Sequence, residues 1–198
     1  NYRTTEQIRR FADGLLATTS NDFDDGAEDR RSQSLLNGPK PIIKEFPNEA
    51  EQARFVLDQV RLLLDQGISS REIAVFARSG SRLQSIRDIL TEAKLEIAPL
   101  NDEEDLSEVR GINLGTMHRA KGLEFKVVFV IDCNQGVVPH AFTLSKMRDQ
   151  GDYDAAYERE RQLLYVAITR ARDEVFVTSV GKPSEFLTSQ PGNTRGQQ

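Results

Sequence analysis

Short apolar segments alternate with longer amphipathic segments along most of the chain, and this alternation constrains the fold more than any other feature. Strands that alternate with helices of 12–18 residues predict an α/β fold, a parallel sheet covered by helices on both faces. The near-continuous apolar run VVFVID at 127–132 is typical of a strand buried on both faces. The expected strands are 42–46, 72–78, 95–100, 111–117, 127–132 and 174–180. The expected helices are 5–18, a segment capped by Asn48 and stopped by Gly67, a segment capped by Ser79 or Ser81, and 154–172.

Composition limits the classes of protein that this chain can represent. A net charge of −5 over 198 residues excludes a strongly basic nucleic-acid coat but allows a local basic site. The single cysteine, Cys133, excludes an internal disulfide and a cysteine-rich zinc site, and indicates a reduced, cytoplasmic compartment. His140 has no histidine or cysteine partner at metal-ligand spacing, so no metal site is expected. The longest apolar run is far shorter than the roughly 20 residues that span a bilayer, and no membrane partner is expected.

The chain is expected to hold one domain with an arm. Residues 1–18 form an arm with a helix, 19–41 a flexible linker rich in polar residues, 42–188 the domain, and 189–198 a disordered tail. Because the sequence begins at Asn1 without methionine, we expect an excised fragment.

Ligands of parallel sheets bind at the carboxyl ends of strands, so the polar residues after Arg78, Met117 and Asp132 are candidates for a site. The richest of these segments is TMHRAKGLEF at 116–125. It holds a hydroxyl, an imidazole, two cations, a glycine and a carboxylate within ten residues. On composition alone, an ordinary polar connection remains open.

The predicted helix 154–172 carries a second unusual feature. Its apolar stripe runs through Leu163, Ile168 and Ala171, and Arg170 lies about 20° from Leu163 on the border of that stripe. A guanidinium in this position either extends its charged end to solvent or meets an anion.

Taken together, these segments resemble the motifs of UvrD/Rep/PcrA-type superfamily-1 DNA helicases. TMHRAKGLEF resembles motif V, ERERQLLYVAITRAR at 158–172 resembles motif VI, and NYRT at 1–4 resembles motif IV. EIAVFARS at 72–79 and QGVVPH at 135–140 are similar to two further segments of that family. The resemblance implies a RecA-like fold, the second of two motor domains, with ATP in the cleft between the domains.

The resemblance also implies roles for residues at the nucleotide. Tyr2 is expected to stack on adenine, and Arg3 and Arg170 to bind the γ-phosphate as catalytic residues. A planar guanidinium matches phosphate oxygens and offsets charge during phosphoryl transfer. Glu124 is expected to bind the ribose hydroxyl, and Gly122 to allow a tight turn beside the nucleotide.

A second group of residues is implied at single-stranded DNA. Thr116, His118 and Arg119 are expected to contact the DNA, and Lys121 to link the DNA and ATP sites. The remaining expected partner is the N-terminal RecA-like domain of the same protein.

The sequence departs from the family pattern in several places. Motif VI has Gln162 where an arginine is usual and Arg159 where a glutamate is usual, while Gln135 and Val138 replace a glutamate and an aromatic residue in the segment after motif V. The 198 residues hold no G-x-x-x-x-G-K-[ST], so a P-loop and its magnesium contact are missing. We therefore expect ATP with Mg²⁺ to bind only together with the first motor domain, and this chain alone to be inactive.

The function predicted from the sequence is the C-terminal motor domain of an ATP-dependent DNA helicase or translocase that moves 3′→5′. One alternative is a RecD-like 5′→3′ helicase domain, although that group tends toward K-S-Q-G where this chain has RAKG. Another is a non-catalytic remnant that only binds DNA or a protein. A third is a helicase–nuclease subunit, but no nuclease-type acidic cluster follows motif VI.

Overall fold

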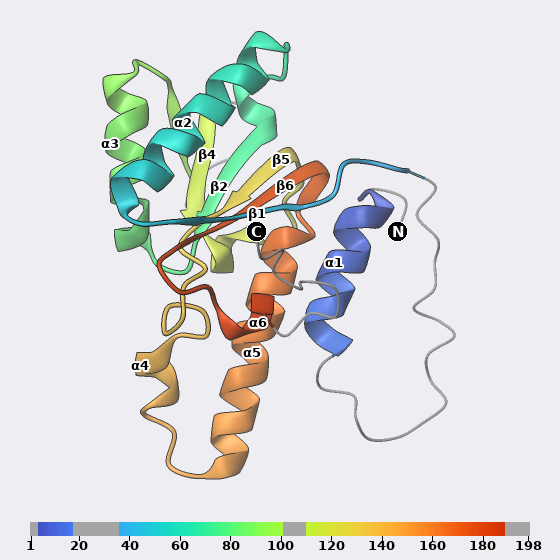
Figure 1. The fold of residues 1–198 in the computed structure, drawn as a ribbon, viewed down its shortest axis with the longest axis vertical. Coiled ribbons are helices and arrows are strands. Elements are labelled where there is room, and N and C mark those ends of the chain that lie inside the picture. The colour runs from blue at the N-terminus through green and yellow to red at the C-terminus, as the bar shows by residue number, and fades with distance from the viewer. Residues whose placement is uncertain (1–3, 18–35, 101–109, 189–198) are drawn as a thin grey trace, which may run out of the picture.

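The structure is a computed structural model that describes residues 4–17, 36–100 and 110–188 (Figure 1). Its six strands form one parallel sheet in the order β1-β6-β5-β2-β4-β3, which confirms the predicted α/β class. The strands are β1 (Ile42–Phe46), β2 (Ile73–Ala77), β3 (Ile97–Pro99), β4 (Ile112–Thr116), β5 (Phe125–Val130) and β6 (Ala171–Val180).

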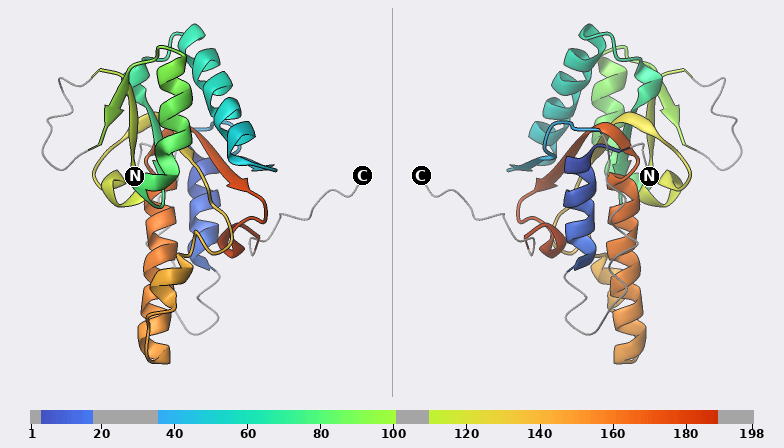
Figure 2. Two further views of the ribbon diagram at one scale, coloured as in Figure 1. Left: turned by 90° about the vertical axis from the view of Figure 1, so that its left-hand side faces the viewer. Right: turned by 90° about the vertical axis from the view of Figure 1, so that its right-hand side faces the viewer.

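Helices cover both faces of the sheet (Figures 1 and 2). Helices α2 and α3 pack on one face, α1 and α5 pack on the other, and α5 extends beyond the sheet beside α4. The helices are α1 (Glu6–Ala17), α2 (Glu49–Asp65), α3 (Gln84–Glu92), α4 (Ala141–Leu144), α5 (Gln150–Ile168) and α6 (Glu185–Thr188). Three short 3₁₀ turns complete the described chain, η1 (Ser70–Glu72), η2 (Gly80–Leu83) and η3 (Met117–Ala120).

Strand β2 shows how the sequence builds two cores. All five of its residues are buried, and they alternate between the two faces. Ala74 and Phe76 pack with α1 and α5, whereas Ile73, Val75 and Ala77 pack with α2 and α3. A central parallel strand has no solvent-facing side, which explains why it reads as a continuous apolar run.

Several details of the sequence prediction were wrong. The strand expected at 127–132 lies at 125–130, and the strand expected at 174–180 begins at 171. Helix α5 ends at Ile168, so Arg170 lies in the turn before β6 and not on the helix. Neither Ser79 nor Ser81 caps a helix with its side chain; the two hydroxyls contact each other at 3.0 Å, and η2 intervenes before α3. By contrast, the Asn48 cap is confirmed, because its side chain accepts a hydrogen bond from the backbone N–H of Glu51 at 2.9 Å.

Much of the expected arm, linker and tail falls outside the described residues. This applies to 1–3, 18–35 and 189–198. The domain boundaries therefore stay a prediction. Within the described ranges, none of the helices is long and apolar enough to cross a membrane.

A buried polar network closes the carboxyl edge of the sheet between α2, β5 and β6. The amide of Gln52 donates to Asp132 Oδ1 at 2.9 Å and accepts from the hydroxyl of Thr178 at 2.7 Å. All three side chains are almost fully buried. Asp132 has a φ of 53°, a left-handed conformation that aspartate and asparagine tolerate better than most residues. Burial is the main cause that raises the pKa of Asp132, and the charge of Glu49 adds to it, against the opposing effects of Gln52 and Arg82.

We expect Asp132→Asn to be more stable than the unmodified chain at pH 7. A raised folded-state pKa means that the contribution of Asp132 is full below its unfolded pKa of about 3.9 and is lost as the pH rises through the folded value. Asparagine keeps the acceptor for Gln52 and the left-handed backbone without the buried charge. Urea denaturation at pH 3 and pH 7 measures the effect, and the advantage should shrink toward pH 3. Asp58→Asn, at an exposed position of α2, is the control. A variant less stable than the unmodified chain at pH 7 would contradict this account of the network.

Candidate functional site

Glu124 and Arg170 come together at the amino edge of the sheet. Strands β5 and β6 are neighbours, and Phe125 pairs with Ala171 in their register. Each candidate residue directly precedes one member of that pair, and the backbone N–H of Phe125 donates to the carbonyl of Arg170 at 3.0 Å. The two residues that the resemblance assigns to the ribose and the γ-phosphate thus enter neighbouring strands side by side.

The side chain of Arg170 is half-buried and oriented by neutral oxygens. Its Nε donates to the carbonyl of Val166 at 3.1 Å, Nη1 to the carbonyl of Leu123 at 3.3 Å, and Nη2 to the hydroxyl of Thr169 at 3.3 Å. Among the residues that the structure describes, none of its partners is a carboxylate. A guanidinium that is fixed in direction but not neutralised is suited to an anion that arrives from outside.

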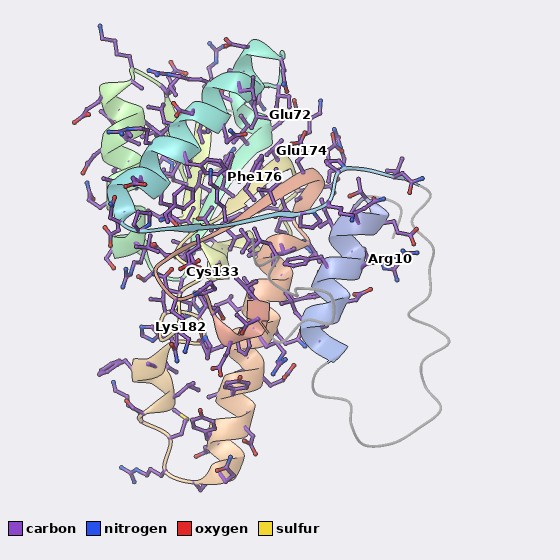
Figure 3. The ribbon with its side chains drawn as sticks, in the orientation of Figure 1. Arg10, Glu72, Cys133, Glu174, Phe176 and Lys182 are labelled. Carbon is purple, nitrogen blue, oxygen red and sulfur yellow. The ribbon has the colours of Figure 1, made fainter. Side chains whose placement is uncertain are left out.

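A shallow pocket of about 490 Å³ lies beside Glu124. Gly122 lines it with a φ of +82°, a conformation that favours glycine, and no atom lies within 4 Å of where a Cβ would be. Glycine is therefore needed here for the backbone turn and not for a close approach within the chain. The other lining residues come from η1 and its cap, from β4, from the segment before β5 and from the first residue of β5: Ser69, Arg71, Glu72, Asn113, Leu123 and Phe125. Figure 3 shows Glu72 and Glu174 toward this edge, away from Cys133 and Lys182.

The three residues expected at DNA lie at the opposite, carboxyl edge. Thr116 ends β4, and His118 and Arg119 belong to η3, which follows it. His118 is exposed, while Met117 and Ala120 of the same turn are buried against α5. The apolar half of η3 fixes the turn, and the polar residues face away from the core.

A connection of eight residues joins the two edges, from Met117 to Glu124. It leaves β4 at the carboxyl edge and returns to the amino edge, where β5 begins, which is a distance of roughly 16 Å for a five-residue strand. Lys121 is exposed on this connection. The candidate DNA, coupling and nucleotide residues of motif V thus follow one another along a single crossing of the sheet.

Although the His118 side chain is exposed, partial loss of water around its ring is the main cause that lowers its pKa. The positive charge of Arg78 lowers it further, and the charge of Glu160 opposes the shift. This shift favours the neutral form of the ring, which can still donate a hydrogen bond.

Arg78 and Glu160 form a buried ion pair at the carboxyl edge that the sequence did not reveal. The guanidinium donates twice to the carboxylate, at 2.7 Å and 2.6 Å, and the two side chains are 13% and 6% exposed. The backbone N–H of His140 also donates to Glu160, at 3.1 Å. The sequence shows only that Arg78 is a polar residue just after a predicted strand. It gives no sign of the partner, because Glu160 lies 82 residues further along the chain.

The remaining candidates, Tyr2 and Arg3, lie outside the described residues, so their roles stay predictions. The nearest described anchor is Thr5, whose backbone N–H donates to the carbonyl of Arg172 at 3.1 Å. This bond joins the start of the described chain to the first residues of β6, beside Arg170. No group of three or more His, Cys, Asp or Glu side chains in the described parts of the chain is arranged to hold a metal ion.

Comparison with known proteins identifies the family. The sequence matches the UvrD-like helicase C-terminal domain family over residues 1–103 and 83–182. The chain belongs to this family. The structure resembles the C-terminal domain of a possible DNA helicase from Lactobacillus plantarum WCFS1, with a TM-score of 0.65 over 97% of this chain and 95% of that one. At 24% identity, that likeness supports the fold alone, and it fits the RecA-like arrangement expected from the sequence.

Two curated relatives match about half of the UvrD-like chain. The putative ATP-dependent DNA helicase YjcD of Bacillus subtilis (strain 168) is 42% identical over 95 residues, which are 48% of this chain and 11% of that protein. The ATP-dependent DNA helicase PcrA of Staphylococcus aureus (strain MRSA252) is 35% identical over 113 residues, which are 54% of this chain and 14% of that protein. The match thus covers only a small part of each relative.

Proposed function

We propose that this domain is the second motor domain of an ATP-dependent helicase that moves 3′→5′ along single-stranded DNA. In this proposal, ATP with Mg²⁺ binds between this domain and an N-terminal RecA-like domain of the same protein. The observation that carries it is the adjacency of Glu124 and Arg170 at the amino edge, one sheet crossing away from Thr116 and His118. The names of the relatives, ATP-dependent DNA helicases, support it.

The chemistry expected of the amino edge is binding and charge stabilisation. Arg170 would donate to oxygens of the γ-phosphate, whose charge redistributes during transfer. Three neutral acceptors already orient the guanidinium of Arg170, so little reorganisation is needed when the anion binds. Glu124 would accept from a ribose hydroxyl, and the turn at Gly122 would leave room for the nucleotide.

The carboxyl edge would supply contacts to the DNA backbone. The Thr116 hydroxyl and a ring N–H of His118 can each donate a hydrogen bond, and Arg119 can donate a charge-assisted one. Lys121 lies between the two edges on the same connection, and we assign it the link between DNA and ATP.

DNA binding by the 198-residue chain tests the carboxyl edge directly. We expect weak binding to single-stranded oligonucleotides that falls steeply with salt, because the net charge of −5 gives no long-range attraction. Arg119→Gln should weaken binding and reduce the log–log salt slope by about 0.7, the value for one phosphate contact on a single strand. Fluorescence anisotropy across a salt series measures both quantities.

The matched control is Arg61→Gln, which removes an exposed cation from α2, a helix on the far face of the sheet from η3. Its salt slope should equal that of the unmodified chain. Tight, salt-insensitive binding, or equal slope changes for the two variants, would contradict a DNA contact at Arg119.

A further inference from the structure

The ion pair between Arg78 and Glu160 stands where four segments of the domain meet. Arg78 follows β2, and the register Ala77–Thr116 sets it beside the start of η3. Glu160 lies within α5, and its carboxylate also accepts from the backbone of His140. The pair therefore connects the end of β2, the segment at His140 and α5 at one point of the carboxyl edge, with the start of η3 beside it.

Stability alone is a weak reason for such a pair. Removing two charges from water costs several kcal/mol per ion in real proteins, and apolar replacements of similar volume are often neutral or stabilising. The bidentate geometry and the third hydrogen bond offset this cost and fix the direction of both side chains. What the pair provides beyond packing is placement of the segments that it joins.

Helix α5 connects the ion pair at the carboxyl edge with Arg170 at the amino edge. From Glu160 to the end of the helix at Ile168 the axis advances roughly 12 Å, and Arg170 follows two residues later. Along this length, α5 also packs against Met117 and Ala120 of η3. Helix α5 thus contacts η3, the candidate DNA-binding turn, and Arg170, the candidate phosphate-binding residue, follows just after the end of the helix.

We propose that Arg78 and Glu160 are positioning residues that fix the DNA-facing turn η3 on α5, so that DNA at the carboxyl edge stimulates ATP turnover at Arg170. This inference rests on the proposed function. Neither side chain is assigned a contact with DNA or ATP. Loss of the pair should loosen η3 on α5 and so weaken the coupling between the two edges, while the nucleotide edge at Arg170 stays formed.

The decisive variant is the double substitution Arg78→Met with Glu160→Met in the complete two-domain protein. Removing both charges avoids an unpaired buried ion, so the fold should be retained. DNA-stimulated kcat should fall about tenfold, while turnover without DNA and the KM for ATP stay unchanged. The control replaces the exposed pair Arg82–Glu49, joined at 3.4 Å, by two glutamines and should keep full stimulation.

His118 provides a second readout, in the 198-residue chain. The sequence has two histidines, so the His118 ring can be followed by NMR through a pH titration. Arg78→Met should raise the pKa of His118, because it removes a positive charge and leaves that of Glu160, while Glu160→Gln should lower it. Opposite shifts would place both charges beside the η3 ring, as in the structure, and equal or absent shifts would contradict the contact between the pair and η3 on which the positioning role depends.

The outcomes separate this inference from the proposed function. If the unmodified two-domain protein shows no DNA-stimulated ATP turnover, the proposed function fails. If it shows stimulation and the double methionine variant, folded by thermal melting, keeps it, the positioning role is overturned. Loss of stimulation together with opposite His118 shifts in the two single variants supports the role.

Discussion

The proposed function predicts that Arg170→Ala abolishes ATP turnover in a protein that joins this domain to its N-terminal motor domain, while sparing the fold and DNA binding. An arginine that supports phosphoryl transfer across a domain interface contributes about 10³–10⁵ in rate, so kcat should fall far more than the KM for ATP rises. The side chain is half-buried in a turn and its described contacts are hydrogen bonds to neutral oxygens. Its truncation should therefore cost little stability. ATPase kinetics at saturating single-stranded DNA, with thermal melts, measure both effects.

The control is Arg172→Ala, two residues further along the chain. The guanidinium of Arg172 pairs with Asp173 at 2.9 Å, a partly exposed ion pair of the kind that contributes little to stability. Its loss should be mild in both assays. Arg3→Ala should act like Arg170→Ala, and the double variant should fall well short of the product of the two effects if both serve one phosphate. A kcat for Arg170→Ala above about a tenth of the unmodified value would refute the assignment.

The fold could be predicted from the sequence because the apolar pattern is the same in the chain and in the structure. The runs around Val75 and Phe129 are continuous because central strands are covered on both faces. The end of α5 could not be predicted. Ala171 is buried in β6 as it would be in a longer helix, and no glycine or proline marks the turn at Thr169 and Arg170.

The candidate site was predictable only in part, for geometric reasons. The general rule for parallel sheets indicates the carboxyl edge, where Thr116 and His118 lie. Glu124 and Arg170 lie at the opposite edge, because they directly precede the first residues of β5 and β6. Their adjacency follows from the pairing of β5 with β6, which a reading of one sequence does not give.

Contacts between segments far apart in the chain could not be predicted from the sequence. Arg78 and Glu160 are 82 residues apart, and Gln52 and Asp132 are 80 apart. Each of these residues, taken alone, is an ordinary polar side chain at the end of a strand or on a helix. Only the crossing order of the sheet and the packing of α2 and α5 bring the partners within hydrogen-bond distance.

Phe129→Ala should give the largest loss of stability among the substitutions considered. The Phe129 ring is fully buried in β5 and stacks on Phe176 at a centroid distance of 4.6 Å with an interplanar angle of 10°. Truncating a buried phenylalanine costs about 3–5 kcal/mol, because transfer energy and cavity formation add. The expected fall in Tm is roughly 10 °C for a domain of this size. Urea denaturation of the 198-residue chain measures the free energy of unfolding.

Phe142→Ala is the matched control, because that ring is 63% exposed on α4 and its removal should change stability by less than about 0.5 kcal/mol. A loss below about 1 kcal/mol for Phe129→Ala would show that the α2–α3 side of the core closes around the missing ring. Phe129 packs on the face of the sheet opposite to α5, so its loss leaves the contacts of Arg170 intact. Well below its lowered Tm, Phe129→Ala in the complete two-domain protein should therefore keep its kcat, whereas Arg170→Ala should keep its Tm and lose its kcat. This reciprocal result is expected only if stability resides in the two apolar layers and turnover in the turn between α5 and β6.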